Sequence, residues 1–185
     1  MKKRDIPNFI SLLRIVLVVP LAFYLWNQNY LTALSLFLIG GLSDGLDGFL
    51  ARRYKWETDL GVILDPMGDK LMMLTAYLLL GWHHLLPWWV VGLVIFRDLI
   101  IVFGTLLYRK FIGVAKLKAL FISKLNTAFQ ILLVLSIMFA QVIELNGLII
   151  DSLLWLVVIT TLMSGYAYMN EWGRRAWHIL KRNEI

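Results

Sequence analysis

Four aspartates lie within the most apolar part of this 185-residue chain, and their spacing groups them into two pairs. Asp44 and Asp47 are three residues apart near the end of one apolar stretch. Asp65 and Asp69 are four residues apart near the start of the next. Residues three or four apart share one face of a helix. Because carboxylates at membrane depth are costly unless paired, neutralised or bound to metal, the two pairs indicate a functional site.

These four carboxylates predict a site for divalent cations. Without counterions they would repel one another strongly at low dielectric, and nearby Arg52 and Lys70 supply too little positive charge. Two divalent ions would balance them, and paired metals about 3.5–4 Å apart can clamp the attacking and leaving oxygens of a phosphoryl transfer. Because the segment from residue 43 to 70 contains neither His nor Cys, Mg²⁺ or Mn²⁺ is favoured over zinc.

The composition is that of a membrane protein. Hydrophobic residues make up 60% of the chain, and the mean hydropathy is +0.75, outside the usual range of soluble domains. The absence of Cys excludes disulfides and thiolate chemistry. A net charge of +6 could suggest nucleic-acid binding. However, the Lys and Arg residues cluster beside apolar stretches, where they orient a membrane protein and meet anionic lipid headgroups. We therefore expect a membrane and no nucleic acid as partner.

The apolar stretches predict an all-α integral membrane protein with six transmembrane helices. Each is about 20 residues long, enough to span a bilayer, and they lie near residues 9–26, 31–50, 61–82, 87–107, 120–143 and 148–169. Basic clusters precede the first stretch and follow the second, fourth and sixth. By the positive-inside rule, both termini are cytoplasmic, as is the end of the helices that carries the aspartates. With no repeat or linker, residues 1–185 are expected to form one multi-pass domain in the inner (cytoplasmic) membrane.

The aspartates belong to a longer motif. Seven residues reproduce the pattern D-G-x2-A-R-x8-G-x3-D-x3-D with every spacing intact: Asp47, Gly48, Ala51, Arg52, Gly61, Asp65 and Asp69. Together with Asp44 three residues upstream, this resembles the signature of the CDP-alcohol phosphatidyltransferases. The opening Pro7-Asn8, Ser11 and Arg14 extend the similarity over nearly the whole chain. The resemblance implies a six-helix membrane homodimer that moves a phosphatidyl or similar group from a CDP-linked lipid to an alcohol.

The resemblance also assigns roles by position. It implies that Asp44, Asp47 and Asp65 ligate metal, and that Asp69 ligates the second ion and serves as general base toward the acceptor hydroxyl. Residues implied to bind the CDP-lipid are Asn8, Ser11, Gly48, Ala51, Arg52, Thr58 and Gly61. No activated Ser, Cys or His is evident in the sequence, so we favour direct attack on CDP-diacylglycerol, with release of CMP, over a covalent intermediate.

Two small residues of the second apolar stretch can be interpreted either as leaving space for a ligand or as a contact between helices. Gly41 and Gly45 are one helical turn apart, a pattern that in membrane helices also indicates close helix packing. Gly48, directly after Asp47, is expected instead to leave room for the nucleotide.

The acceptor alcohol is left open between two choices. Residues 122–128, ISKLNTA, resemble the eukaryotic-type cardiolipin synthase branch more than typical phosphatidylglycerophosphate synthases. We favour that branch, which uses phosphatidylglycerol and gives cardiolipin; the alternative acceptor is glycerol 3-phosphate, giving phosphatidylglycerophosphate. Candidates for binding the phosphate of either acceptor are Arg97, Lys116, Lys118 and Lys124. Arg14 and Arg97 also have structural interpretations, either snorkelling or pairing with Asp98.

Two other classes of function could use acidic residues in a membrane. A cation transporter predicts acids spread through the depth of the bilayer and an inverted repeat, whereas here the acids gather at one predicted face and no repeat is found. A metal-binding scaffold would not need the spacing of Ala51-Arg52 and Gly61.

Overall fold

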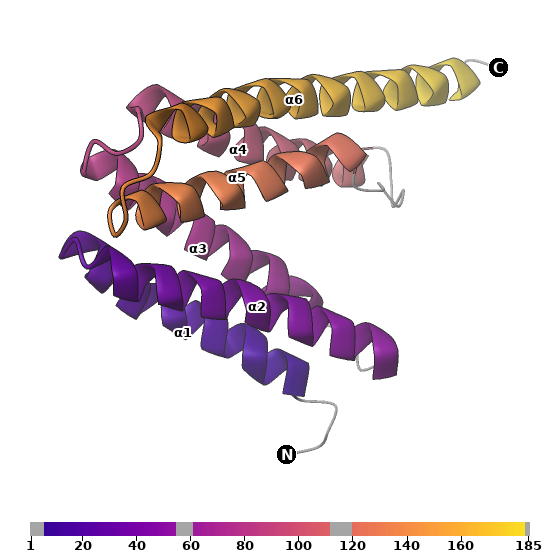
Figure 1. Cartoon of the computed structure of the whole chain (residues 1–185). Coiled ribbons are helices and arrows are strands. Elements are labelled where there is room, and N and C mark those ends of the chain that lie inside the picture. Colours follow the sequence, from indigo (N-terminus) through magenta and orange to yellow (C-terminus); the bar gives the residue numbers. More distant parts are fainter. Residues whose placement is uncertain (1–5, 55–60, 112–119, 184–185) are drawn as a thin grey trace. The chain divides into compact units, whose positions relative to one another are not determined.

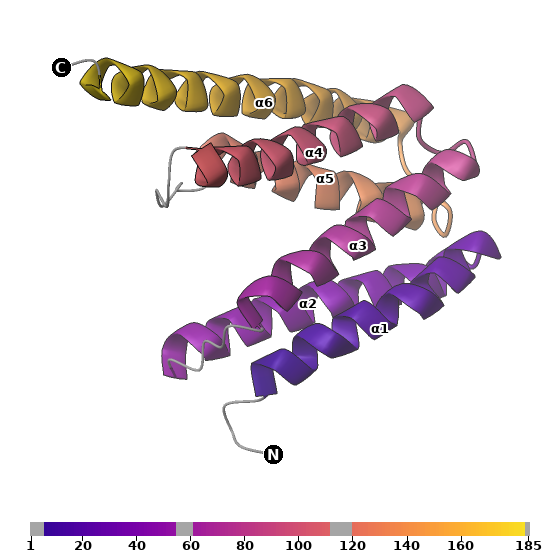
Figure 2. The same ribbon diagram turned by 180° about the vertical axis from the view of Figure 1, so that it is seen from behind.

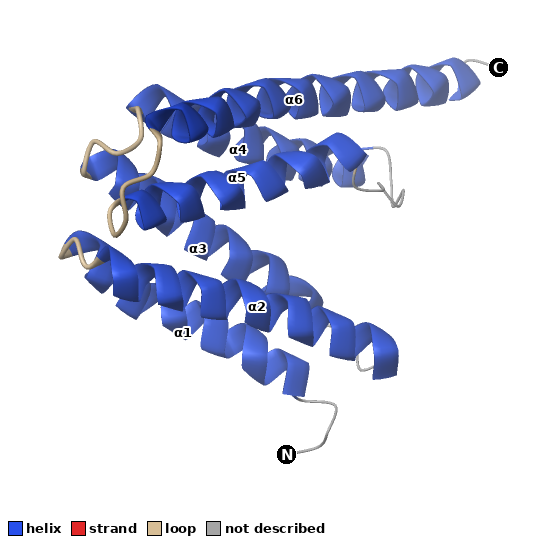
Figure 3. Ribbon diagram, in the orientation of Figure 1, coloured by secondary structure: helices blue, strands red, loops and turns tan. Residues whose placement is uncertain are grey.

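The computed structural model describes residues 6–54, 61–111 and 120–183, and the elements in these ranges are helices (Figures 1 and 3). Within the helices, side chains are described except at residues 6–11, 44, 46–53, 61–66, 106–111, 172–173 and 175–183. The helices are α1 (Ile6–Trp26), α2 (Tyr30–Tyr54), α3 (Gly61–Trp82), α4 (Trp88–Phe111), α5 (Phe121–Ala140) and α6 (Gly147–Asn183). The prediction of an all-α protein is confirmed.

Some helices are longer than the apolar stretches that predicted them. The sixth stretch was predicted at 148–169, but α6 continues to Asn183. Its last part is polar and basic yet contains no Pro and consists mostly of residues compatible with a helix. In the same way α2 continues to Tyr54, beyond the apolar stretch predicted at 31–50. The length of an apolar stretch therefore predicts which part of a helix is suited to a membrane. It does not predict where the helix ends.

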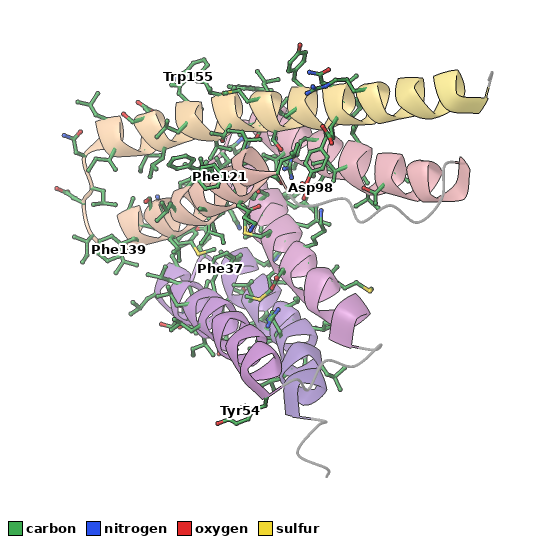
Figure 4. The ribbon with its side chains drawn as sticks, turned by 90° about the vertical axis from the view of Figure 1, so that its right-hand side faces the viewer. Phe37, Tyr54, Asp98, Phe121, Phe139 and Trp155 are labelled. Atoms are coloured by element: carbon green, nitrogen blue, oxygen red, sulfur yellow. The ribbon has the colours of Figure 1, made fainter. Side chains whose placement is uncertain are left out.

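Three helices in the described part of the chain are long and apolar enough to cross a bilayer. These segments are Trp88–Thr105, Phe121–Ala140 and Gly147–Glu171. Shorter apolar segments are found at Leu12–Trp26 and Tyr30–Ser43. Much of the apolar surface is exposed, as lipid-facing positions require: Trp155, for example, is 58% exposed and points outward from α6 (Figure 4).

The chain divides into two compact units, and the first contains the predicted catalytic helices. It comprises residues 1–86 and 134–145, that is α1, α2, α3 and the end of α5. Within it, α1 packs along both α2 and α3 (Figure 2). Side chains in its core include Leu21, Leu25, Phe37, Met72 and Leu80. Because α1 contacts both of its neighbours, it is the element that brings the two aspartate-bearing helices together.

The second unit is held together by polar as well as apolar contacts. It comprises residues 87–133 and 146–185, that is α4, the first part of α5, and α6, with α4 packed along α6. The hydroxyls of Thr160 and Thr161 each lie 2.9 Å from Oδ1 of Asn126 on α5. All three residues are buried. In lipid the hydrophobic effect does not drive helices together, so such hydrogen bonds between helices contribute to their association.

The Asn126 amide links α5 and α6 in either of its orientations. The Thr160 hydroxyl also lies 2.7 Å from the carbonyl oxygen of Leu156 on its own helix, and it has a single proton to donate. When that proton goes to Leu156, a rotated Asn126 amide can donate its N–H groups to the hydroxyls instead.

We expect Asn126→Leu to lower the stability of the protein in detergent. The substitution keeps the volume roughly constant but removes both hydrogen bonds to α6, each of which is worth about 1 kcal/mol. The thermal unfolding midpoint measures this loss. Thr127→Val is the matched control, because Thr127 is exposed and its hydroxyl bonds to the Ser123 carbonyl of its own helix. Equal midpoints for Asn126→Leu and the wild type would contradict a stabilising role.

Candidate metal and diphosphate site

The four predicted metal ligands lie on two helices of the first unit. Asp44 and Asp47 are in α2, and Asp65 and Asp69 are in α3. Both segments are α-helical at these positions, so each pair shares one face of its helix, as the spacing predicted. The side chains of Asp44, Asp47 and Asp65 lie outside the described residues, and their convergence stays a prediction.

Two glycines of α2 near the predicted site have no close neighbour among the described residues. A Cβ added at Gly41 or Gly45 would meet no described atom within 4 Å, and both glycines are exposed. The helical period places positions 44 and 48 on the same stripe. Within the described part of the chain, close helix packing occurs instead at Gly40, where a Cβ would lie 2.5 Å from Cε of Met72. Among the described residues, Gly41 and Gly45 therefore take part in no close helix packing, and a ligand beside them stays a prediction.

Asp69 forms an ion pair with a buried arginine of α1. Its Oδ1 accepts a hydrogen bond from Nη1 of Arg14 at 2.6 Å. The Arg14 side chain is 1% exposed, whereas that of Asp69 is 46% exposed. The carboxylate is thus anchored from within the packing of α1 and α3 and remains accessible from outside. This partner of Arg14 differs from the snorkelling or the pairing with Asp98 expected from the sequence, in which the one signal was an arginine in an otherwise apolar span.

The donor set fits a hard divalent cation. Carboxylate oxygens are the ligands that Mg²⁺ and Mn²⁺ prefer, and the Asp69 side chain is 46% exposed. Among the side chains that the structure describes, no three of Asp, Glu or His gather into a metal site. Three of the four predicted ligands, Asp44, Asp47 and Asp65, are outside that set, so the cation site stays a prediction from the donor chemistry.

All of the described residues that are predicted to bind the CDP-lipid lie in the first unit. Asn8 and Ser11 lie on α1. On α2 lie Gly48, Ala51 and Arg52, and Gly61 is the first residue of α3. Thr58 lies outside the described residues. Since α1 packs on α2 and α3, the three helices that bear these positions are neighbours.

Among the predicted acceptor residues, Arg97 is buried in the second unit. Its Nη1 donates to Oδ1 of Asp98 at 2.6 Å. Its Nη2 donates to the hydroxyls of Ser123 on α5 and Ser164 on α6, at 2.6 and 2.5 Å. The structural interpretation, pairing with Asp98, is confirmed for Arg97. Lys124 is exposed on α5, and residues 116 and 118 lie outside the described ranges, so binding of an acceptor by these side chains stays a prediction.

Comparison with known proteins gives one family. Residues 4–164 match the sequence model described as CDP-alcohol phosphatidyltransferase. The chain is 32% identical to "Cardiolipin synthase (CMP-forming)" of Rattus norvegicus and of Homo sapiens, over 95% of this chain and 64% of the relative. It is 33% identical to "CDP-diacylglycerol--glycerol-3-phosphate 3-phosphatidyltransferase 1, chloroplastic" of Oryza sativa subsp. japonica, over 89% of this chain and 56% of the relative. The chain therefore spans between 56% and 64% of the length of these curated relatives.

We expect the purified protein to bind Mn²⁺, and Asp65→Asn to weaken that binding by about tenfold or more, because an amide oxygen carries no charge to balance the ion. Electron paramagnetic resonance of free Mn²⁺ during a titration measures the affinity directly. Asp151→Asn is the matched control, since Asp151 is exposed at the start of α6. Equal Mn²⁺ affinity in the two variants would contradict the assignment of the cation site.

Proposed function

Because the chain belongs to the CDP-alcohol phosphatidyltransferase family, we propose that it transfers a phosphatidyl group from CDP-diacylglycerol to a glycerol-containing alcohol, with release of CMP. The observation that carries this proposal is the complete motif on α2 and α3, inside the region that the family match covers. A metal-binding scaffold, considered above, would not require the spacing of Ala51-Arg52 and Gly61, and a cation transporter would predict acids spread through the depth of the bilayer. The names of the rat and rice relatives support phosphatidyl transfer.

The chemistry follows from the carboxylates. Asp69 removes the proton of the acceptor hydroxyl, whose oxygen attacks the phosphorus that bears the diacylglycerol. The phosphoanhydride bond to CMP breaks, and CMP leaves with the bonding electrons. Asp44, Asp47, Asp65 and Asp69 would hold two Mg²⁺ or Mn²⁺ ions, which would supply positive charge to the diphosphate.

Donor binding is proposed for the residues at the inner ends of the first three helices. Arg52 supplies a guanidinium suited to phosphate oxygens, and Gly48 leaves room for the nucleotide. The other positions proposed to contact the CDP-lipid are Asn8, Ser11, Ala51, Thr58 and Gly61.

Phosphatidylglycerol is the acceptor that we propose, with cardiolipin as product. The resemblance of residues 122–128 supports it, as do the names of the rat and human relatives. The name of the rice relative supports glycerol 3-phosphate as the alternative. Candidates for contact with the phosphate of either acceptor are Arg97, Lys116, Lys118 and Lys124.

The membrane arrangement is part of the same proposal. Residues 1–185 form one catalytic domain with six spans and both termini cytoplasmic, in the inner membrane, and two copies associate as a homodimer. Apolar segments in five of the helices and basic clusters on alternate sides of the predicted spans support the topology.

We expect Asp69→Asn to reduce CMP release from CDP-diacylglycerol by about 10²–10⁴-fold, because an amide cannot take the proton of the acceptor hydroxyl. The measurement is single-turnover release of labelled CMP in detergent micelles containing Mg²⁺ and acceptor. Asp151→Asn is expected to release CMP at the wild-type rate. A variant Asp69→Asn with normal turnover would reject the assigned base.

The acceptor is tested by offering phosphatidylglycerol and glycerol 3-phosphate in parallel to the purified protein with CDP-diacylglycerol. We expect cardiolipin from the first and no lipid product from the second, as identified by mass spectrometry. Phosphatidylglycerophosphate from the second reaction, with no cardiolipin from the first, would select the alternative acceptor.

A further inference from the structure

The side chain of Arg14 occupies an unusual position in the first unit. It is among the largest fully buried side chains of the described chain, although it carries a full positive charge on an otherwise apolar part of α1. Burial of a charge is costly, and it persists only where a partner compensates it. The carboxylate of Asp69, the proposed general base, is a partner that meets this requirement, with 2.6 Å between Nη1 and Oδ1.

Glycines on both neighbouring helices adjoin the aliphatic part of Arg14. A Cβ added at Gly68 on α3 would lie 3.4 Å from Cδ of Arg14, and a Cβ added at Gly40 on α2 would lie 3.9 Å from its Cγ. Gly68 immediately precedes Asp69, and Gly40 lies one turn before Asp44. The guanidinium is therefore placed by the packing of three helices, two of which carry the predicted carboxylates.

The two partners differ in their freedom to move. Arg14 is enclosed on all sides, whereas nearly half of the Asp69 side chain is accessible. A fixed donor beside an accessible carboxylate restricts the rotation of that carboxylate. An ionised carboxylate has two oxygens and about four acceptor positions. A contact with Arg14 is thus compatible with a second contact to a substrate hydroxyl or a cation.

From this geometry we propose that Arg14 is a positioning residue, whose buried guanidinium holds the Asp69 carboxylate in the orientation that removes the proton of the acceptor hydroxyl. The inference rests on the proposed function, because it concerns the base of that reaction. A misplacement of about 1 Å at a reacting group can cost on the order of 100-fold in rate. The loss of Arg14 should therefore appear in kcat.

The first test replaces Arg14 by Met, which has a flexible apolar side chain, and by Lys. We expect Arg14→Met to lower kcat by about 100-fold, with the KM for CDP-diacylglycerol and the affinity for Mn²⁺ within about threefold of wild type. Arg14→Lys should lie between Met and wild type, since an ammonium keeps the charge but loses the planar fork. Arg174→Met, at an exposed position of α6, is the matched control and should keep the wild-type kcat.

A double-mutant cycle with Asp69→Asn tests whether Arg14 acts through the carboxylate. If it does, Arg14→Met should lower single-turnover CMP release no further once Asp69 is already Asn, because residues that act as a unit are not additive. Independent, multiplicative losses in the double variant would overturn the proposal, and so would a wild-type kcat in Arg14→Met.

Two further outcomes keep the inference separate from the proposed function. If Arg14→Met does not fold, as judged by its thermal unfolding, the cycle is run with Arg14→Lys, and a wild-type kcat for that variant would overturn the proposal. If the wild-type protein releases no CMP with either acceptor, the proposed function fails instead. Mn²⁺ affinity that falls in Arg14→Met as far as in Asp65→Asn would also overturn the proposal, because Arg14 would then be needed to assemble the cation site.

Discussion

The need to compensate charge inside an apolar helical protein shapes both units of this molecule. In the first unit the buried guanidinium of Arg14 is compensated by Asp69. In the second, Arg97 is compensated by Asp98 and by two serine hydroxyls. Each arginine is nine-tenths or more buried, so each needs its partners if the helices around it are to pack. The carboxylates of the two clusters are both partly accessible, and that of Asp69 is the more exposed, at 46% against 31% for Asp98.

The apolar surroundings also decide how the helices associate. Lipid is as apolar as the side chains that face it, so helix pairing depends on close packing and on hydrogen bonds between helices. Gly40 and Gly68 allow close approach in the first unit, and Asn126 with its two threonines links α5 to α6 in the second. The polar groups of the second unit therefore serve as structural contacts, whereas Asp69 in the first unit is a proposed reacting group.

Residues 122–128, on which the proposed acceptor depends, also have a structural use. Ser123 accepts a hydrogen bond from Arg97, and Asn126 is hydrogen-bonded to Thr160 and Thr161 of α6. The segment that resembles the cardiolipin synthase branch thus helps to hold the second unit together. Ser123 and Asn126 therefore have a packing role. Because a packing role and a binding role can share one segment, the acceptor assay is needed to test the binding role.

The sequence by itself determined the all-helical architecture, the helical placement of both aspartate pairs and the family, since these depend on local apolar length, on spacing and on a contiguous motif. Helix ends such as Asn183 were not predictable, because a polar segment can continue a helix without an apolar signal. Only the tertiary structure decided that Asp69 pairs with Arg14, 55 residues away in the chain. It also decided that Gly40 is closely packed against Met72. Both outcomes depend on how α1, α2 and α3 rotate against one another, which the spacing within a single helix does not specify.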